Sequence, residues 1–354
     1  MSSGTHHLPE FFTELIQTSS ASGYEAEAFA VFDKRVKPAA DLYACDALGN
    51  RLGFLNPAGS PTVLLTGYLD EPGFIITHIS KDGFVYFDLL GEHDRSAIAG
   101  RSVVVHSGNG PVKGITGKRI FQLGDGPEHK KTSEVQDMWI DIGTRSKRAT
   151  LDRVAIGDAA TYDRAFEVIH GSVGAGRGLE GKLGAYVAGE AFIRLARDRS
   201  QITCKLAIVA AVQGQIGTGG VGPAAFSVSP ELAIAVDCRT ATDVPESNKR
   251  KHGDIELGGG PILSRGPNIS GDIFRRLQYT ANGMGLPYQV EAEARPNRGG
   301  IGSIQLIRNG ILTGRVRIPI RYSGSPSEVV DLRDVESCVQ LLVEFAKSDF
   351  DKDT

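Results

Sequence analysis

The sequence has little cysteine and no long apolar run. Its four cysteines stand far apart and form no CxxC pair: Cys45, Cys204, Cys238 and Cys338. This pattern excludes a disulfide-stapled scaffold, a zinc ribbon and a thioredoxin-like redox motif. The longest apolar run, Leu206 to Val212, is far shorter than the roughly 20 residues that a membrane-spanning helix needs. We therefore expect no membrane partner.

An excess of charge of one sign is also lacking. The chain carries 39 Lys and Arg against 42 Asp and Glu, a net charge of -3. It therefore has no overall positive field to hold a nucleic acid, although the basic run 249–251 leaves a local patch open. Residues 1–9 lack the basic stretch and the apolar stretch of a targeting peptide. We expect a cytoplasmic protein with no nucleic-acid partner.

The length of 354 residues favours two domains. The pattern of predicted secondary structure changes twice along the chain. From Gly73 to Val168, short β-type runs are separated by glycines and show no helical period, which predicts a small all-β unit. Two helical patterns and strand-like runs at 46–55 and 63–69 come before it. After Gly171, helices and strands alternate, as in a mostly parallel sheet covered on both faces. We predict an α/β domain of residues 1–71 and 169–354, interrupted by a β-barrel of residues 72–168.

In such a fold, ligand-binding and catalytic residues are expected in the loops that follow buried strands. Three strand-like runs end in polar residues: 63–69 in Asp70 and Glu71, 205–212 in Gln213-Gly214-Gln215, and 232–236 in Asp237. A fourth candidate segment, residues 321–328 (RYSGSPSE), precedes the final helix. None of the eight histidines has HxxxH, HxD or HxxE spacing at a strand end. There is no GxSxG elbow and no phosphate-binding glycine loop.

Several segments nevertheless resemble those of one enzyme family. Residues 67–74 (GYLDEPGF), 140–143 (IDIG), 178–182 (GLEGK), 212–217 (VQGQIG), 235–237 (AVD) and 321–328 are similar to segments of the TET-type glutamyl or deblocking aminopeptidases. The resemblance covers nearly the whole chain. It implies a carboxypeptidase-like mixed sheet flanked by helices, an inserted all-β barrel domain, and assembly into large particles. The family members are cocatalytic metallopeptidases.

The departures from the family pattern fall on the residues that carry its chemistry. By this resemblance, the two metal-binding histidines are replaced by Tyr68 and Gly324, the bridging aspartate by Glu180, the general base by Gly214, and a ligand glutamate by Gln215. Only Asp237 keeps its identity among the ligands, and Asp70, which orients a histidine in the family, is also kept.

These replacements remove the means of hydrolysis. Glycine has no side chain with which to bind a metal or move a proton, and Gln215 is a neutral and therefore weak ligand. Tyr68 would bind a metal only as a phenolate, which its ordinary pKa of ~10 opposes. We expect no metal and no cofactor. The alternative is a rebuilt site that holds Zn, Co or Mn, or one hard cation such as Mg²⁺ or Ca²⁺ bound by Asp70, Glu71, Glu180 and Asp237.

The resulting hypothesis is a family member that has lost metal-dependent peptide hydrolysis. It would act as a structural, regulatory or peptide-binding subunit, in a homo-oligomer or in a mixed particle with an active paralogue. The expected binding cleft consists of Tyr68, Asp70, Glu180, Gln215, Asp237 and Gly324. Alternatively, Asp70 and Asp237 only hydrogen-bond backbone groups at strand ends, and Glu180 is a partly solvated carboxylate near Lys182. The competing hypothesis is an active metal-dependent aminopeptidase or related hydrolase with a rebuilt site.

Overall fold

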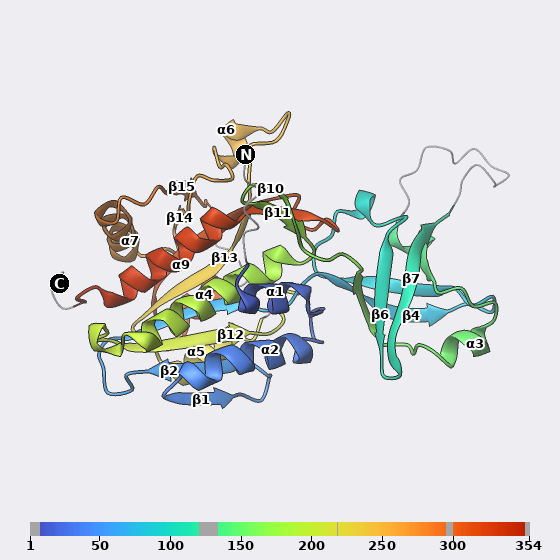
Figure 1. Cartoon of the computed structure of the whole chain (residues 1–354), viewed down its shortest axis with the longest axis horizontal. Coiled ribbons are helices and arrows are strands. Elements are labelled where there is room, and N and C mark those ends of the chain that lie inside the picture. The colour runs from blue at the N-terminus through green and yellow to red at the C-terminus, as the bar shows by residue number, and fades with distance from the viewer. Residues whose placement is uncertain (1–7, 120–133, 218, 295–299, 351–354) are drawn as a thin grey trace.

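The computed structural model describes residues 8–119, 134–217, 219–294 and 300–350. It consists of an α/β body and a smaller β-barrel that projects from one end of it (Figure 1). The body contains an 11-stranded mixed sheet and the barrel is closed by six strands. This architecture confirms the predicted fold class.

The large sheet has the strand order β1-β2-β12-β3-β13-β16-β17-β11-β10, and β14 and β15 extend it beside β16. In that order its strands are Leu42–Cys45, Arg51–Leu55, Lys205–Ala211, Thr62–Tyr68, Leu232–Thr240, Leu312–Arg321, Glu328–Asp331, Val173–Gly176 and Glu167–His170, with β14 at Ile262–Arg265 and β15 at Gln289–Ala292. The four central strands, β12, β3, β13 and β16, are parallel. They are rich in Val, Ile, Leu and Ala because both faces of the sheet are covered.

Helices cover both faces of the sheet. One face packs against α1 (Glu10–Gln17), α2 (Ala26–Val36), α4 (Leu179–Arg197), α7 (Gly271–Gly283) and α9 (Leu332–Lys347). The other packs against α5 (Val221–Val228) and α8 (Ile301–Gln305). A short helix, α6 (Lys249–His252), lies outside these layers. Among the described residues, no helix is both long and apolar enough to cross a membrane.

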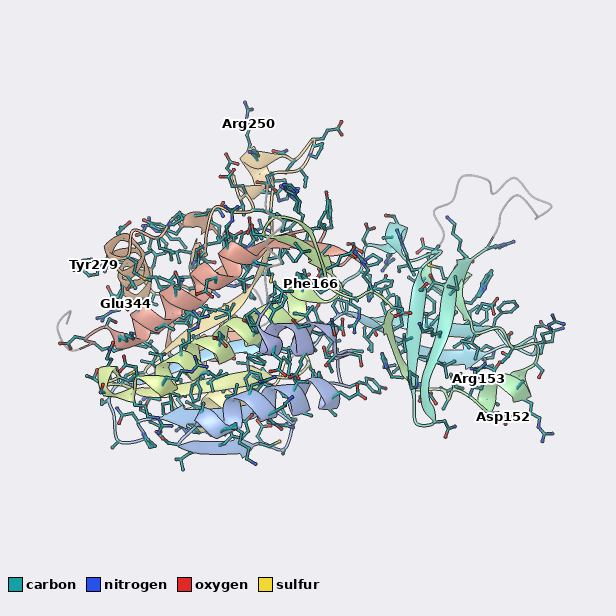
Figure 2. All side chains as sticks on the ribbon, viewed as in Figure 1. Asp152, Arg153, Phe166, Arg250, Tyr279 and Glu344 are labelled. Atoms are coloured by element: carbon teal, nitrogen blue, oxygen red, sulfur yellow. The ribbon has the colours of Figure 1, made fainter. Side chains whose placement is uncertain are left out.

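The barrel has the strand order β4-β5-β8-β7-β6-β9. These strands are Gly73–Ile79, Val85–Leu90, Met138–Asp141, Gly110–Lys118, Ser102–Ser107 and Ala159–Tyr162, and α3 (Lys147–Leu151) lies between β8 and β9. The expected boundary at residue 168 falls inside β10, which already pairs with the large sheet. Figure 2 shows Phe166 where the chain returns to the α/β body. Its ring lies 5.1 Å from that of Phe12 and fits against Gly174, where a Cβ would lie 2.2 Å from Cζ of Phe166.

Strand register sets the position of the candidate site. Tyr68 of β3 is paired with Ala211 of β12, and Asp237 of β13 with Arg317 of β16. Because Ala235 is the partner of Thr66, Asp237 stands level with Tyr68 across the sheet. β3 and β12 end at Tyr68 and Ala211, whereas β13 and β16 continue past Asp237 and Arg317 to Thr240 and Arg321. Asp237 therefore lies inside its strand and not, as the sequence predicted, directly after a strand end. These four residues lie side by side at the edge where β3 and β12 end, a usual place for ligand sites in α/β folds.

Candidate functional site

A cavity of about 280 Å³ lies at this edge of the sheet. Five positions singled out in the sequence line it: Tyr68, Glu180, Gly214, Gln215 and Asp237. The remaining lining residues are Glu92 from the barrel, Gly181, Gly217, Val236, Cys238, Gly300, Arg315 and Arg317. Asp70 and Gly324 do not line it. The structure therefore brings together most of the expected cleft and adds two arginines to it.

Tyr68 fills the space beside Gly214. Its hydroxyl accepts a hydrogen bond from the Gly300 N–H at 2.7 Å, and burial raises the pKa of the phenol, which therefore stays neutral. A Cβ at Gly214 would lie 2.2 Å from Cγ of Tyr68, and one at Gly219 would lie 2.4 Å from its Cε1. A side chain at position 214 is thus incompatible with the tyrosine ring in its present place.

Asp70 holds the turn that follows β12. Its carboxylate is fully buried and accepts hydrogen bonds from the N–H groups of Gly214 and Gln215, each at 2.8 Å. Burial raises its pKa to about 6, and these hydrogen bonds oppose that rise. Asp70 thus does what one of the sequence-based alternatives expected, because it binds backbone groups at a strand end.

Glu71 is committed to a different network. Its buried carboxylate pairs with Arg177 and, at 3.0 Å, with Lys182, and it accepts a hydrogen bond from the Ser20 N–H at 2.9 Å. Burial on its own would raise its pKa, but Arg177 and Lys182 outweigh burial and lower the pKa to about 2. Glu71 does not line the cavity, so the four carboxylates expected to share one hard cation do not come together.

Glu180 stands in the first turn of α4 and accepts a hydrogen bond from the Ser323 hydroxyl. The side chain is partly exposed, as one alternative expected, but that alternative is wrong in placing it beside Lys182, because the Lys182 ammonium pairs with Glu71. Burial raises the pKa of Glu180, and the negative charges of Asp237 and Glu92 raise it further.

Glu328 is a fully buried carboxyl group beside the partly exposed Glu180. It accepts hydrogen bonds from the N–H groups of Glu180 and Gly324, each at 2.9 Å. Burial, together with the charge of Glu180, raises the pKa of Glu328 to about 8. Gly324 thus contributes through its backbone only, and its φ of +73° suits glycine.

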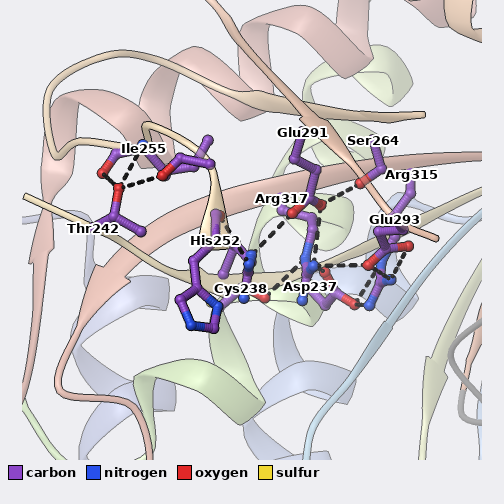
Figure 3. Close-up of polar contacts among 12 residues, drawn as sticks. Asp237, Cys238, Thr242, His252, Ile255, Ser264, Glu291, Glu293, Arg315 and Arg317 are labelled. Carbon is purple, nitrogen blue, oxygen red and sulfur yellow. Dashed lines mark hydrogen bonds and ion pairs between the residues drawn. The ribbon is translucent and has the colours of Figure 1, made fainter. Parts of the chain in front are cut away.

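Asp237 is clamped between two arginines of the neighbouring strand β16 (Figure 3). Arg315 Nε lies 2.9 Å from Oδ2 and Arg317 Nε lies 2.8 Å from Oδ1. Burial on its own would raise the pKa of Asp237, but the two guanidinium groups outweigh it and hold the pKa below its usual range. Both carboxylate oxygens are therefore engaged by fixed positive charges.

The arginines are in turn neutralised by two glutamates of β15. Glu293 lies 2.7 Å from Arg315 Nη1 and 3.1 Å from Arg317 Nη1, and Glu291 lies 3.0 Å from Arg317 Nη1. Arg239 adds a further pair with Glu291 at 3.0 Å. Three guanidinium groups thus face three carboxylates, and the network is balanced in charge.

These residues do not fit a cocatalytic metal pair. Within the described ranges, no three His, Cys, Asp or Glu side chains are grouped so that they could hold a metal ion. The carboxylate at Asp237 is already bound by Arg315 and Arg317, and Gln215 and Tyr68 are neutral. A divalent cation would also meet the repulsion of the two guanidinium groups, which cannot be deprotonated.

Sequence reasoning missed this arginine pair. The sequence contained a signal for it, because like charges stand two residues apart in two places. Arg315 and Arg317 flank Val316, and Glu291 and Glu293 flank Ala292. In a strand, residues two apart share one face. Two arginines on one face of a buried strand require acidic partners, and a strand with the matching acids lies close by in sequence.

Comparison with known proteins agrees with this fold. The M42 glutamyl aminopeptidase family matches residues 49–341. A putative aminopeptidase of Acetivibrio thermocellus is 30% identical over 326 residues, covering 91% of this chain and 93% of that protein. The lysyl aminopeptidase of Pyrococcus furiosus is 27% identical and covers 94% of each chain.

Solved structures give the same result. A TET aminopeptidase from a marine sediment archaeon of the Thaumarchaeota superposes with a TM-score of 0.90 at 28% identity, over 96% of this chain and 95% of that one. A TET peptidase of Pyrococcus horikoshii that can assemble into a tetrahedron or a large octahedral shell superposes with a TM-score of 0.82 at 27% identity, over 95% and 98%. The chain belongs to the M42 glutamyl aminopeptidase family.

Proposed function

We propose that this M42 family member does not hydrolyse peptides with a metal pair and acts instead as a non-hydrolytic subunit whose cleft binds a ligand. One observation carries the proposal: both oxygens of Asp237, the only ligand position that keeps its family residue, are bound by Arg315 and Arg317. The guanidinium groups supply at this carboxylate the positive charge that a metal ion supplies in a metallopeptidase.

The rest of the cleft supports the same proposal. The family's general-base position is Gly214, and the Tyr68 ring fills the space that a side chain there would need. General-base catalysis typically contributes ~10²–10⁴-fold to a rate, so its loss alone would be severe. We further propose that the chain forms a homo-oligomer or joins a mixed particle with an active paralogue, because the TET peptidase of Pyrococcus horikoshii can assemble into a tetrahedron or a large octahedral shell. Light scattering on the purified chain tests this assembly.

Elemental analysis and a peptide-hydrolysis assay test the proposal that the protein neither binds a metal pair nor hydrolyses peptides. We expect no stoichiometric metal in the purified protein and no release of amino acids from peptides when Zn²⁺, Co²⁺ or Mn²⁺ is added. Asp237→Asn should leave both results unchanged. The proposal is overturned if the unmodified protein holds metal and turns over peptides, and if Asp237→Asn abolishes both. That outcome would establish the competing hypothesis of an active hydrolase with a rebuilt site.

A further inference from the structure

The cavity keeps an acidic side whose carboxyl groups form no ion pair with a described residue, although the Arg317 guanidinium lies near enough to favour the charged form of Glu180. Glu180 accepts a hydrogen bond from the Ser323 hydroxyl but forms no ion pair with any residue that the structure describes. Glu328 lies behind it, and Glu92 of the barrel lines the same cavity. Burying carboxyl groups without a cation is costly. An incoming ammonium group would offset that cost.

The cavity also keeps a side that donates hydrogen bonds. Arg317 uses Nε and Nη1 for its contacts with Asp237, Glu291 and Glu293, whereas its Nη2 donates no hydrogen bond to another described residue. The side-chain amide of Gln215 likewise has no hydrogen-bond partner within the described ranges, and both residues line the cavity. A carboxylate is the natural acceptor for such a pair of donors.

We propose that the cavity binds a free α-amino acid, with its ammonium group at Glu180 and its carboxylate at Arg317 and Gln215. This inference rests on the proposed function, because the ligand occupies space that metal ions would otherwise take. The volume of about 280 Å³ is just below the usual ~300–1,000 Å³ of ligand pockets, which suits a single amino acid rather than an extended peptide.

The charge balance also sets a preference among amino acids. Arg239, Arg315 and Arg317 are matched by three carboxylates in their own network, so the charges of Glu180 and Glu92 remain in excess. A ligand with net positive charge balances this excess better than a neutral one. Lysine should therefore bind more tightly than leucine, and leucine more tightly than glutamate.

Calorimetric titration of the purified chain with lysine, Nα-acetyl-lysine and lysinamide tests the proposal. Lysine should bind, and removing either its ammonium charge by acetylation or its carboxylate by amidation should weaken binding about tenfold or more, the cost of a lost charged hydrogen bond. If lysinamide binds as tightly as lysine, the site recognises the α-ammonium group without the carboxylate, as it would in a peptide N-terminus. That result would overturn the proposal. Absence of lysine binding at millimolar concentration would do the same.

Variants locate the site within the chain. Glu180→Gln and Arg317→Lys should each weaken lysine binding about tenfold. Glu344→Gln, the same chemical change at an exposed position of α9 (Figure 2), should leave it unchanged. If Arg317→Lys fails to fold, as judged by its melting curve, Gln215→Ala replaces it. Normal affinity in Glu180→Gln would overturn the assignment.

Failure of this inference is distinguishable from failure of the proposed function. Metal content and peptide hydrolysis are measured on the same preparation. A metal-free, non-hydrolysing protein that binds no amino acid overturns the ligand assignment alone. A metal-loaded, hydrolysing protein overturns the proposed function and, with it, this use of the cavity.

Discussion

Tyr68 and three glycines around its ring depend on one another. Gly214, Gly219 and Gly300 leave room for the ring, and the Gly300 N–H donates to its hydroxyl. A metal-binding or catalytic side chain cannot return to position 214 while the tyrosine stays. The residues at these two positions therefore form a single packing arrangement and are not two independent replacements.

This dependence predicts the effect of adding one methyl group. Gly214→Ala should destabilise the protein by ~1–3 kcal/mol, because the new Cβ would lie 2.2 Å from the Tyr68 ring and the site would be overpacked. In a Tyr68→Ala background the same change should have little effect, because the ring is gone. Denaturant unfolding of the two single variants, the double variant and the parent measures this coupling. Gly108→Ala is the matched control, since a Cβ there meets nothing within 4 Å; equal effects of Gly214→Ala in both backgrounds would contradict the packing argument.

Glu328 predicts a pH dependence of stability. Burial raises its pKa to about 8 in the folded protein, against an ordinary value of ~4.3 in the unfolded chain. The folded state thus holds this proton more tightly, so the stability from Glu328 is fully present below ~4.3 and is lost as the pH rises through about 8. The unfolding free energy of the parent should fall more between pH 6 and pH 8.5 than that of Glu328→Gln. Burial lowers the pKa of Lys182 to about 8, so this residue changes the unfolding free energy with pH in the opposite direction, but it is present in both proteins. Parallel pH profiles of the unfolding free energy for the parent and Glu328→Gln would contradict the prediction.

The expected site residues could be read from the sequence only where a polar residue ends a buried run. Asp70 and Gln215 have this position after β3 and β12, and the parallel pairing of these strands brings the two residues together. Asp237 follows the apolar run 232–236, although β13 continues beyond it to Thr240. The arginine clamp could not be found in this way, since Arg315 and Arg317 lie inside β16 and not at its end. Its partners belong to β15, which reaches β16 only through β14, and such pairing is set by tertiary structure.

At the scale of elements, short runs show both the success and the limit of sequence patterns. The run 63–69 corresponds to β3 and 205–212 to β12, where several β-branched and apolar residues follow one another. The single strand expected over 46–55 is wrong in its first half. There Asp46 accepts hydrogen bonds from the N–H groups of Leu48, Gly49 and Asn50 and closes a turn between β1 and β2.

A buried ion cluster fastens the N-terminal helices to the sheet. Lys182 of α4 donates to the carbonyl oxygens of Ile16 and Thr18 while it pairs with Glu71, which follows β3. Arg177 joins the same carboxylate and donates to the Gln17 carbonyl. One carboxylate thus neutralises two buried cations that hold the end of α1.

Removing that carboxylate charge should be severe. Glu71→Gln leaves Lys182 and Arg177 buried without a counter-ion and should cost ~3–5 kcal/mol of unfolding free energy. The double variant Glu71→Gln with Lys182→Met should recover part of this loss, because one buried cation is then gone. Chemical denaturation measures both variants. Glu14→Gln, which removes a half-exposed carboxylate paired with Lys34 and Arg35, serves as a control with little effect. A Glu71→Gln protein as stable as the control would show that the cluster does not hold the helices.

At the scale of the whole molecule, the barrel takes part in shaping the cleft. Glu92 lines the cavity, and the Asp94 N–H donates to the Gly324 carbonyl at 3.0 Å. Gly91 lies against Gln215, where a Cβ would come within 2.9 Å of the glutamine Cβ. A side chain at position 324 would need a left-handed backbone conformation and would approach the Glu92 carbonyl to 3.1 Å. The barrel segment 91–94 therefore packs closely against positions 215 and 324, and larger side chains at Gly91 or Gly324 would not fit there without a local shift.

Restoring the family's residues should consequently not restore metal binding by itself. We consider the five changes Tyr68→His, Gly214→Glu, Gln215→Glu, Gly324→His and Glu180→Asp. They return ligands and base, but Asp237 stays bound by two guanidinium groups, and these repel a divalent cation. Adding Arg315→Met and Arg317→Met frees both Asp237 oxygens and removes two positive charges.

Elemental analysis after dialysis against Zn²⁺ distinguishes the two proteins. The five-change protein should hold no stoichiometric zinc, and the seven-change protein should hold it, because ligand type and the charge around the site decide whether a divalent metal binds. The parent carrying only the two arginine changes is the control and should stay metal-free, since Tyr68, Gly214 and Gly324 still offer no ligands. Zinc in the five-change protein would show that Arg315 and Arg317 are no barrier. It would also remove the observation on which the proposed non-hydrolytic function rests, so this comparison tests the arginine clamp directly.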